Sequence, residues 1–232
     1  MDLVRTGTRI GFKDGVYTDK TINGVLMADR YTERISKEGF MAKNAIALLA
    51  EGFEEVEAVT PIDYLRRAGI TVTIVAVGGA AIGGNLPVKG ARGITVNADI
   101  TLKNLLQQQK AASFDAVVIP GGMPGATNIA ASKEAGALIT EMASAGKLVC
   151  AICAAPAVVL APLGLLSGKK FTCYPGMEEK VQGGRWTDER VAIDGAIITS
   201  RGAGTAGEFA VAIIAQLLDQ AAGDKIAQAV LL

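Results

Sequence analysis

Short apolar runs alternate with longer amphipathic segments through most of this chain, and this alternation limits the possible folds more than any other feature. Near-continuous apolar runs are typical of parallel strands that helices cover on both faces. The pattern therefore predicts an α/β domain with three layers around a mostly parallel sheet. The expected strands are 44–50, 70–77, 114–119, 147–152, 169–173 and 191–199. The expected helices are one that ends near 68–69, then 102–109, 130–145, 154–160 and a last one at 206–218, with a hairpin within 80–98.

The chain contains no histidine, which restricts the chemistry it can perform. A Ser-His-Asp or Cys-His hydrolase site cannot be built within the chain, nor can a metal site with histidine ligands. The 23 basic residues balance the 23 acidic ones, so net charge gives no reason to propose a nucleic-acid or membrane partner. Catalysis would have to use Cys, Glu, Asp, Tyr, Lys or backbone groups, placed where ligands of parallel sheets bind, at the carboxyl ends of strands.

One segment, VCAICAAP at 149–156, has the features of a nucleophile elbow. An apolar strand leads into Cys153, and a helix is expected directly after it, with small residues Ala154 and Ala155 permitting a sharp turn. A thiol at a helix N-terminus is expected to have a lowered pKa. The alternative is that Cys153 is a small buried apolar residue, and its place at the end of a strand favours the reactive interpretation.

The other two cysteines have simpler interpretations. Three cysteines are too few for a disulfide scaffold, and the N-terminus has no signal-peptide pattern, so we expect a cytoplasmic protein. Cys150 lies inside the strand, which excludes a thioredoxin-like C-x-x-C site and favours a core position. Three cysteines without histidine also leave a zinc site short of ligands. Cys173 ends a strand and could be a resolving thiol, although passive packing is the simpler interpretation.

Three glutamates, Glu54, Glu55 and Glu57, stand near the start of the first expected helix. Acidic residues in a first helical turn are ordinary partners of the helix dipole, and at least two of the three are expected to be of this kind. Glu57 differs because apolar residues surround it in sequence. In an apolar cleft it would stay protonated, and it could hydrogen-bond a thiolate or relay a proton.

Two glycine-rich loops follow strands. The segment PGGMPG at 120–125 could offer backbone N–H groups to an oxyanion. The segment GAGTAG at 202–207 matches G-x-G-x-x-G, but too few residues follow it to complete a dinucleotide-binding unit. We expect the second loop to let a helix and a strand pack closely.

Residues 1–40 differ in character from the rest, with a strand–turn–strand over 8–17 as the best local interpretation. Codons that fit residues 37–40 can contain a ribosome-binding sequence just before Met41. We therefore expect either a misassigned start, with translation beginning at Met41, or a genuine, disordered N-terminal arm ahead of one domain at 41–232.

In this order and spacing, the motifs resemble the ThiJ/PfpI superfamily, in particular the branch of the parkinsonism-associated deglycase. The resemblance covers residues 41–232 and leaves 1–40 without a counterpart. It rests on AEGFEEVEAVTPIDYLRRAGITVT (50–73), DAVVIPGGMPGATN (115–128), CAICAAPAVVLA (150–161), YPGMEEKVQGGRW (174–186) and ITSRGAGTAGEFA (198–210). The resemblance implies a flavodoxin-like fold, a homodimer and catalysis without a cofactor or metal.

The resemblance also implies roles for single residues. Cys153 corresponds to the family's reactive cysteine and Glu57 to the protonated glutamate beside it. Gly122 and Ala154 correspond to backbone donors at the oxyanion position. Tyr174 stands where histidine is common, so the third role is open. Two arginines of the family's dimer and anion site correspond to Arg92 and Arg201.

These roles imply an enzyme of the glyoxalase III/deglycase type. Its substrates would be methylglyoxal, related α-oxoaldehydes or their early glycation adducts, converted to hydroxy acids through a Cys153 hemithioacetal. The first alternative is an oxidative-stress sensor or chaperone that uses oxidation of Cys153. A cysteine peptidase is disfavoured by the missing histidine, and a nonenzymatic dimer with a vestigial pocket is the remaining alternative.

Overall fold

The computed structural model describes residues 11–13, 16–18, 43–79, 85–109 and 111–232, and the chain divides into two compact units, Met1–Met41 and Ala42–Leu232. In the first unit, β1 (Gly11–Lys13) pairs antiparallel with β2 (Val16–Thr18). This pairing confirms the two strands expected within 8–17. The turn expected at residues 14–15 lies outside the described residues, as do residues 19–42.

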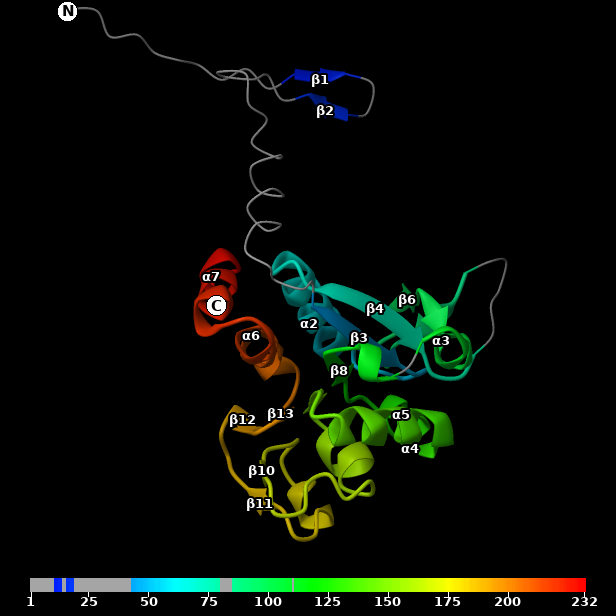
Figure 1. Ribbon diagram of the computed structural model, residues 1–232, viewed down its shortest axis with the longest axis vertical. Coiled ribbons are helices and arrows are strands. Elements are labelled where there is room, and N and C mark those ends of the chain that lie inside the picture. The colour runs from blue at the N-terminus through cyan, green and yellow to red at the C-terminus, as the bar shows by residue number, and fades with distance from the viewer. Residues whose placement is uncertain (1–10, 14–15, 19–42, 80–84, 110) are drawn as a thin grey trace, which may run out of the picture. The chain divides into compact units, whose positions relative to one another are not determined.

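The second unit is built on a seven-stranded sheet (Figure 1). The strand order is β12-β13-β9-β8-β3-β4-β7, and every neighbouring pair is parallel except β12 with β13. These strands are β3 (Asn44–Leu49), β4 (Thr71–Ala76), β7 (Ile100–Thr101), β8 (Ala116–Ile119), β9 (Leu148–Ile152), β12 (Val191–Asp194) and β13 (Ile197–Ser200). The expected mostly parallel sheet is confirmed.

Helices cover both faces of this sheet and bury two separate apolar cores (Figure 1). Successive residues of β3 alternate between the cores, Ile46 and Leu48 facing one and Ala47 and Leu49 the other, as the two-residue period of a strand requires. The first core is covered by α3 (Leu102–Gln108), α4 (Gly125–Ala131) and α5 (Lys133–Ser144). The second is covered by α2 (Glu55–Arg67), α6 (Ala206–Leu217) and α7 (Gln220–Ala229). The three-layer arrangement is therefore also as expected.

The order of the strands creates a switch point between β3 and β8. From β3 the chain first crosses to β4 on one side and later returns to β8 on the other. Ligands of such sheets bind at the carboxyl edge beside a switch point, which here lies next to the loops after β3 and β8.

Two expected strands differ in the structure. The run 191–199 is a hairpin of β12 and β13, because Gly195-Ala196 forms a two-residue turn with Gly195 at φ 63°. The run 169–173 contains only the two-residue β10 (Lys170–Phe171), which pairs with β11 (Arg185–Trp186) outside the main sheet. The expected hairpin within 80–98 is confirmed as β5 (Pro87–Lys89) with β6 (Thr95–Asn97), and residues 80–84 lie outside the described part.

Two expected helices also need correction, and one further helix was not expected. The helix expected at 130–145 is two helices, because Ser132 has extended backbone and its hydroxyl accepts a hydrogen bond from the N–H of Ala135 at 3.1 Å, which caps α5. The last expected helix is followed by α7, capped by Asp219. The helix expected at 154–160 is a π-helical turn over Pro156–Leu160.

Candidate active site

Cys153 follows β9 directly and has φ 64°, a backbone conformation that residues other than glycine rarely adopt. Its backbone is fixed on both sides. The N–H of Cys153 donates to the carbonyl of Ser200 at 2.9 Å, and its carbonyl accepts from the N–H of Tyr174 at 2.8 Å. The bend leaves the thiol half-buried at the switch point. It is the nucleophile elbow expected from the sequence.

Glu57 reaches the same point from the first turn of α2. Its side chain is 1% exposed, and its Oε2 accepts a hydrogen bond from the N–H of Gly121 at 2.9 Å. The carboxyl group is also hydrogen-bonded to the Cys153 thiol and to the N–H of Ala203. Burial is the main reason that the pKa of Glu57 rises from 4.5 to about 7, and the charge of Glu54 adds to the rise.

The glycines after β8 permit this close approach. A side chain at Gly121 would place its Cβ 2.8 Å from Cβ of Cys153 and 2.8 Å from Oε2 of Glu57. Gly122 has φ 82°, and a Cβ there would collide with the backbone of residues 52–54. The N–H of Glu54 donates to the carbonyl of Gly121 at 3.0 Å, so the loops after β3 and β8 are locked together.

The pKa of the Cys153 thiol differs from the sequence-based expectation. Burial, the Glu57 charge and the hydrogen bond to Glu57 raise it to about 12, against the lowering effect of the Ala154 and Gly122 N–H groups. The expected lowering of the thiol pKa is wrong, because burial and the neighbouring Glu57 carboxyl group outweigh the N–H groups at the start of the π-helical turn. The Glu57 carboxyl and the Cys153 thiol therefore titrate as a coupled pair, in which protonation of Glu57 removes the charge that opposes a thiolate.

The structure brings five of the predicted site residues together. The Cys153 sulfur atom has three of them as neighbours, namely the Glu57 carboxyl group and the backbone N–H groups of Gly122 and Ala154. Tyr174 stands beside them, because its ring and Glu57 Oε1 both lie within 4 Å of the position that a Cβ on Gly202 would occupy.

The two predicted arginines make their described contacts elsewhere. The Arg92 N–H donates to Glu55 Oε1 at 2.6 Å while its side chain is exposed, and Arg201 Nη1 donates to the carbonyl of Asp188 at 3.1 Å.

Sequence reasoning missed two features near the site. Glu55 is 5% exposed and its Oε1 also accepts from the N–H of Ile94, so it anchors the 90–94 loop to α2. The 202–207 loop supplies the Ala203 N–H to Glu57, and its Gly207 makes room for Leu232 rather than for close helix–strand packing. No local signal points to either, because each depends on contacts far apart in the sequence.

The remaining cysteines lie in the cores. Cys150 is fully buried and burial raises its pKa. Cys173 is 1% exposed, and burial together with the Glu178 charge raises its pKa to about 12. Within the described residues, no three His, Cys, Asp or Glu side chains are grouped so that they could hold a metal ion. No helix in the same part of the chain is long and apolar enough to cross a membrane.

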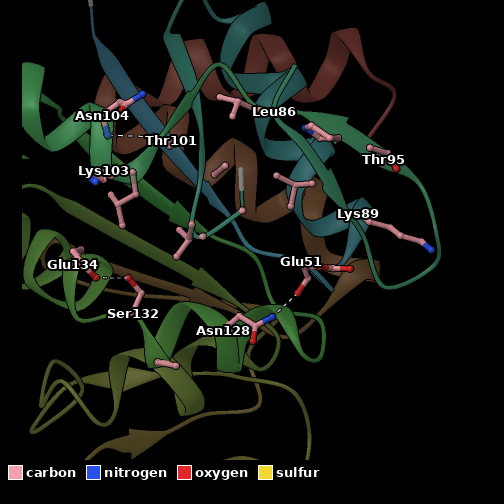
Figure 2. A pocket seen from close by; sticks show the side chains of 18 residues that line it. Glu51, Leu86, Lys89, Thr95, Thr101, Lys103, Asn104, Asn128, Ser132 and Glu134 are labelled. Carbon is pink, nitrogen blue, oxygen red and sulfur yellow. Dashed lines mark hydrogen bonds between the residues drawn. The ribbon is translucent and has the colours of Figure 1, made fainter. Parts of the chain in front are cut away.

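A cavity of about 990 Å³ lies away from this site, at the ends of β4 and β7 (Figure 2). Leu86, Val88 and Leu102 contribute apolar surface to it, and Lys89, Lys103, Asn128 and Glu134 are among its polar lining residues. Asn128 is held by a hydrogen bond from its amide nitrogen to the carbonyl of Glu51 (Figure 2). None of the residues predicted for the site lines this cavity.

Comparison with known proteins gives a consistent result. The profile of the DJ-1/PfpI family matches residues 43–216. Glutathione-independent glyoxalase DJR-1.2 from Caenorhabditis elegans is 36% identical over 178 residues, 75% of this chain and 89% of that protein. Protein DJ-1 homolog B from Arabidopsis thaliana is 39% identical over 183 residues, 79% of this chain, which spans 40% of that longer relative. The solved structure of oxidized Toxoplasma gondii DJ-1 superposes with a TM-score of 0.76 at 36% identity and covers 82% of this chain and 98% of that one.

Proposed function

The chain belongs to the DJ-1/PfpI family, and from this premise we propose that it is a cofactor-free enzyme of the glyoxalase/deglycase type. Its substrates are methylglyoxal and related α-oxoaldehydes or their early glycation adducts. The observation that carries the proposal is the buried Glu57 carboxyl group, hydrogen-bonded to a half-buried cysteine at the switch point of the sheet. A relative that bears the name glyoxalase supports the same class of reaction.

The pair can perform the reaction with one shared proton. Cys153 thiolate adds to the aldehyde carbon, and the new alkoxide takes the proton from Glu57, which gives a hemithioacetal. The Glu57 carboxylate then removes the hydrogen from that carbon and returns a proton to the neighbouring carbon, while the hydroxyl proton passes from the first oxygen to the second, which gives a thioester of the hydroxy acid. Water hydrolyses the thioester and restores the thiol. The N–H groups of Gly122 and Ala154 stabilise the negative oxygen at the addition and hydrolysis steps.

Turnover of methylglyoxal to lactate in amine-free buffer tests this proposal. We expect Cys153→Ala to abolish turnover and Cys173→Ala, at a buried thiol outside the site, to retain it. A Cys153→Ala protein that converts methylglyoxal at the parental rate refutes the proposed mechanism. A wild-type protein that forms no lactate refutes the enzyme and leaves a nonenzymatic role with a vestigial pocket.

The second candidate is an oxidative-stress sensor or chaperone based on oxidation of Cys153. Cys153 is half-buried whereas the other two cysteines are buried, which makes it the most accessible thiol of the three. The solved relative described as oxidized supports this candidate. Treatment with hydrogen peroxide followed by mass spectrometry should find Cys153 as sulfinate before Cys150 or Cys173 is modified. Modification of another cysteine first contradicts the sensor role, and the missing histidine continues to disfavour a peptidase.

We also propose a cytoplasmic homodimer. Val56 and Val59 are 48% and 45% exposed on one side of α2, and Ile94, which Glu55 anchors nearby, is 60% exposed. Such apolar surface is typical of a contact between protein chains. Arg92 belongs to the same loop and would border the contact. Light scattering after gel filtration should give twice the mass of the chain, and Val56→Asp should shift the protein to the monomer.

A further inference from the structure

The structure places an aromatic ring at the edge of the cysteine site, beside a residue that has no side chain. Tyr174 is 53% exposed, although its backbone N–H is fixed to the carbonyl of Cys153. Because the backbone is fixed and the side chain is free, the ring can gain contacts from a bound molecule without a change in the fold.

Gly202 is the residue beside the ring that has no side chain. The position of a Cβ on Gly202 lies 3.7 Å from Cδ2 of Tyr174 and 3.9 Å from Oε1 of Glu57. The absence of a side chain at Gly202 therefore leaves a gap between the ring and the catalytic carboxyl group. Gly202 has φ 166°, which is ordinary extended backbone, so the backbone conformation does not require glycine here.

We propose that Tyr174, Gly202 and Glu57 form a slot for a flat substituent on the substrate, and that the preferred substrates are α-oxoaldehydes bearing an aryl group rather than a methyl group. This inference rests on the proposed function, because the aldehyde carbon must lie at Cys153. An aryl group fills the slot above Gly202 and contacts the Tyr174 ring, either face to face with an offset or edge to face. A methyl group is too small to reach the ring.

The kinetic test compares phenylglyoxal with methylglyoxal, and 3,3-dimethyl-2-oxobutanal serves as a bulky substrate that is not flat. We expect the wild type to favour phenylglyoxal in kcat/KM, mainly through a lower KM, because the ring contact exists before and during the reaction. Tyr174→Phe keeps the ring and should keep the preference. Tyr174→Leu should reduce the ratio of the two kcat/KM values by about two- to tenfold.

Gly202→Ala provides an independent test of the slot. Its methyl group would lie in ordinary contact with the Tyr174 ring and Glu57, so the fold should be retained while the slot is filled. We expect turnover of phenylglyoxal to fall more than turnover of methylglyoxal, with an unchanged thermal unfolding midpoint. A preference that survives both Tyr174→Leu and Gly202→Ala overturns the proposal, as does equal preference for the bulky substrate.

Binding of the product anions separates this inference from the proposed function. Calorimetry with mandelate and lactate measures the affinity of the slot for an aryl group without any turnover. If the wild type converts neither aldehyde, the proposed function fails, and a mandelate preference that Tyr174→Leu removes still supports the slot. If mandelate binds no better than lactate, the slot is refuted whether or not methylglyoxal is converted.

Discussion

Two carboxyl groups at opposite ends of β8, one partly buried and one fully buried, show how differently the same sheet treats a carboxyl group. Asp115 precedes the strand at its amino end, whereas Gly121, just beyond the carboxyl end, donates its N–H to Glu57. Asp115 accepts a hydrogen bond from the N–H of Asn44 at 3.0 Å. Its Oδ1 lies 3.3 Å from Nζ of Lys147 and 3.7 Å from Nζ of Lys43. Burial raises the pKa of Asp115, but these partners outweigh it and lower the pKa overall.

Within the described part of the chain, no lysine or arginine contributes to the pKa of Glu57. Its partners are backbone N–H groups and a thiol, and burial prevails, so its pKa rises to about 7. The amino end of β8 therefore stabilises a fixed charge, whereas the carboxyl end keeps a proton available near neutral pH. This difference is typical of a sheet that is held together at one edge and performs chemistry at the other.

The largest expected effect is on catalysis. Glu57→Gln retains the shape of the side chain but cannot transfer a proton, and we expect kcat/KM for methylglyoxal to fall roughly 10²- to 10⁴-fold. Asp115→Asn, the matched change at the other end of β8, should leave kcat/KM unchanged. Steady-state kinetics of both variants checks the comparison, and equal losses would show that the two ends do not differ in function.

The second effect concerns stability and pH. The folded pKa of Glu57 lies above its unfolded value of 4.5, so its contribution to stability is complete below pH 4.5 and is lost as the pH rises through about 7. Glu57→Gln should therefore stabilise the protein by up to about 3 kcal/mol at high pH and by little at pH 4.5. Urea unfolding at pH 5 and pH 8.5 measures this, and a variant less stable at pH 8.5 would contradict it.

A smaller effect is expected from added volume at the carboxyl end. Gly121→Ala places a methyl group against Cys153 and Glu57 and should destabilise the protein by about 1–3 kcal/mol and lower kcat/KM. Gly136→Ala in α5 meets only Leu163 at 3.4 Å and should instead stabilise the helix by about 1 kcal/mol. Chemical denaturation of the two variants is the measurement, and equal effects would show that the site is not tightly packed.

The smallest effect is expected at Asp115. Asp115→Asn weakens the contacts to Lys147 and the Asn44 N–H, and we expect a loss of about 1 kcal/mol at neutral pH. Because the folded pKa of Asp115 is depressed, this stability is present above the unfolded pKa and is lost as the pH falls through the folded one. Unfolding experiments at pH 7 and pH 3 should show the difference between the variant and the wild type shrink. A difference that persists at pH 3 would contradict this assignment.

Much of the fold could be predicted because strands that are buried on both faces appear in the sequence as continuous apolar runs. The boundaries failed where one residue changed the backbone. Ser132 divided a helix, and the turn at Gly195-Ala196 reversed a strand, although Ser132 is a known cap residue and Gly195 a known turn residue. The final α7 follows Asp219, another cap signal.

The candidate site could be predicted from the sequence for the same reason, because Cys153 and Glu57 each follow a strand. What no local pattern contains is the distance between segments. Three features depend on residues that lie far apart in the chain. They are the hydrogen bond between Glu57 and Ala203, the anchoring of the 90–94 loop by Glu55 and the gap above Gly202. The thiol pKa was misjudged because burial and a neighbouring carboxyl group outweighed the helix terminus.

The φ of 64° at Cys153 has a consequence for engineering. A left-handed backbone costs a residue with a side chain roughly 1–2 kcal/mol, and glycine avoids most of that cost. Cys153→Gly is therefore a route to a chemically inert protein that folds at least as well as the parent. Such a variant would be a suitable scaffold for trapping intact substrates in crystals, because it removes the proposed nucleophile.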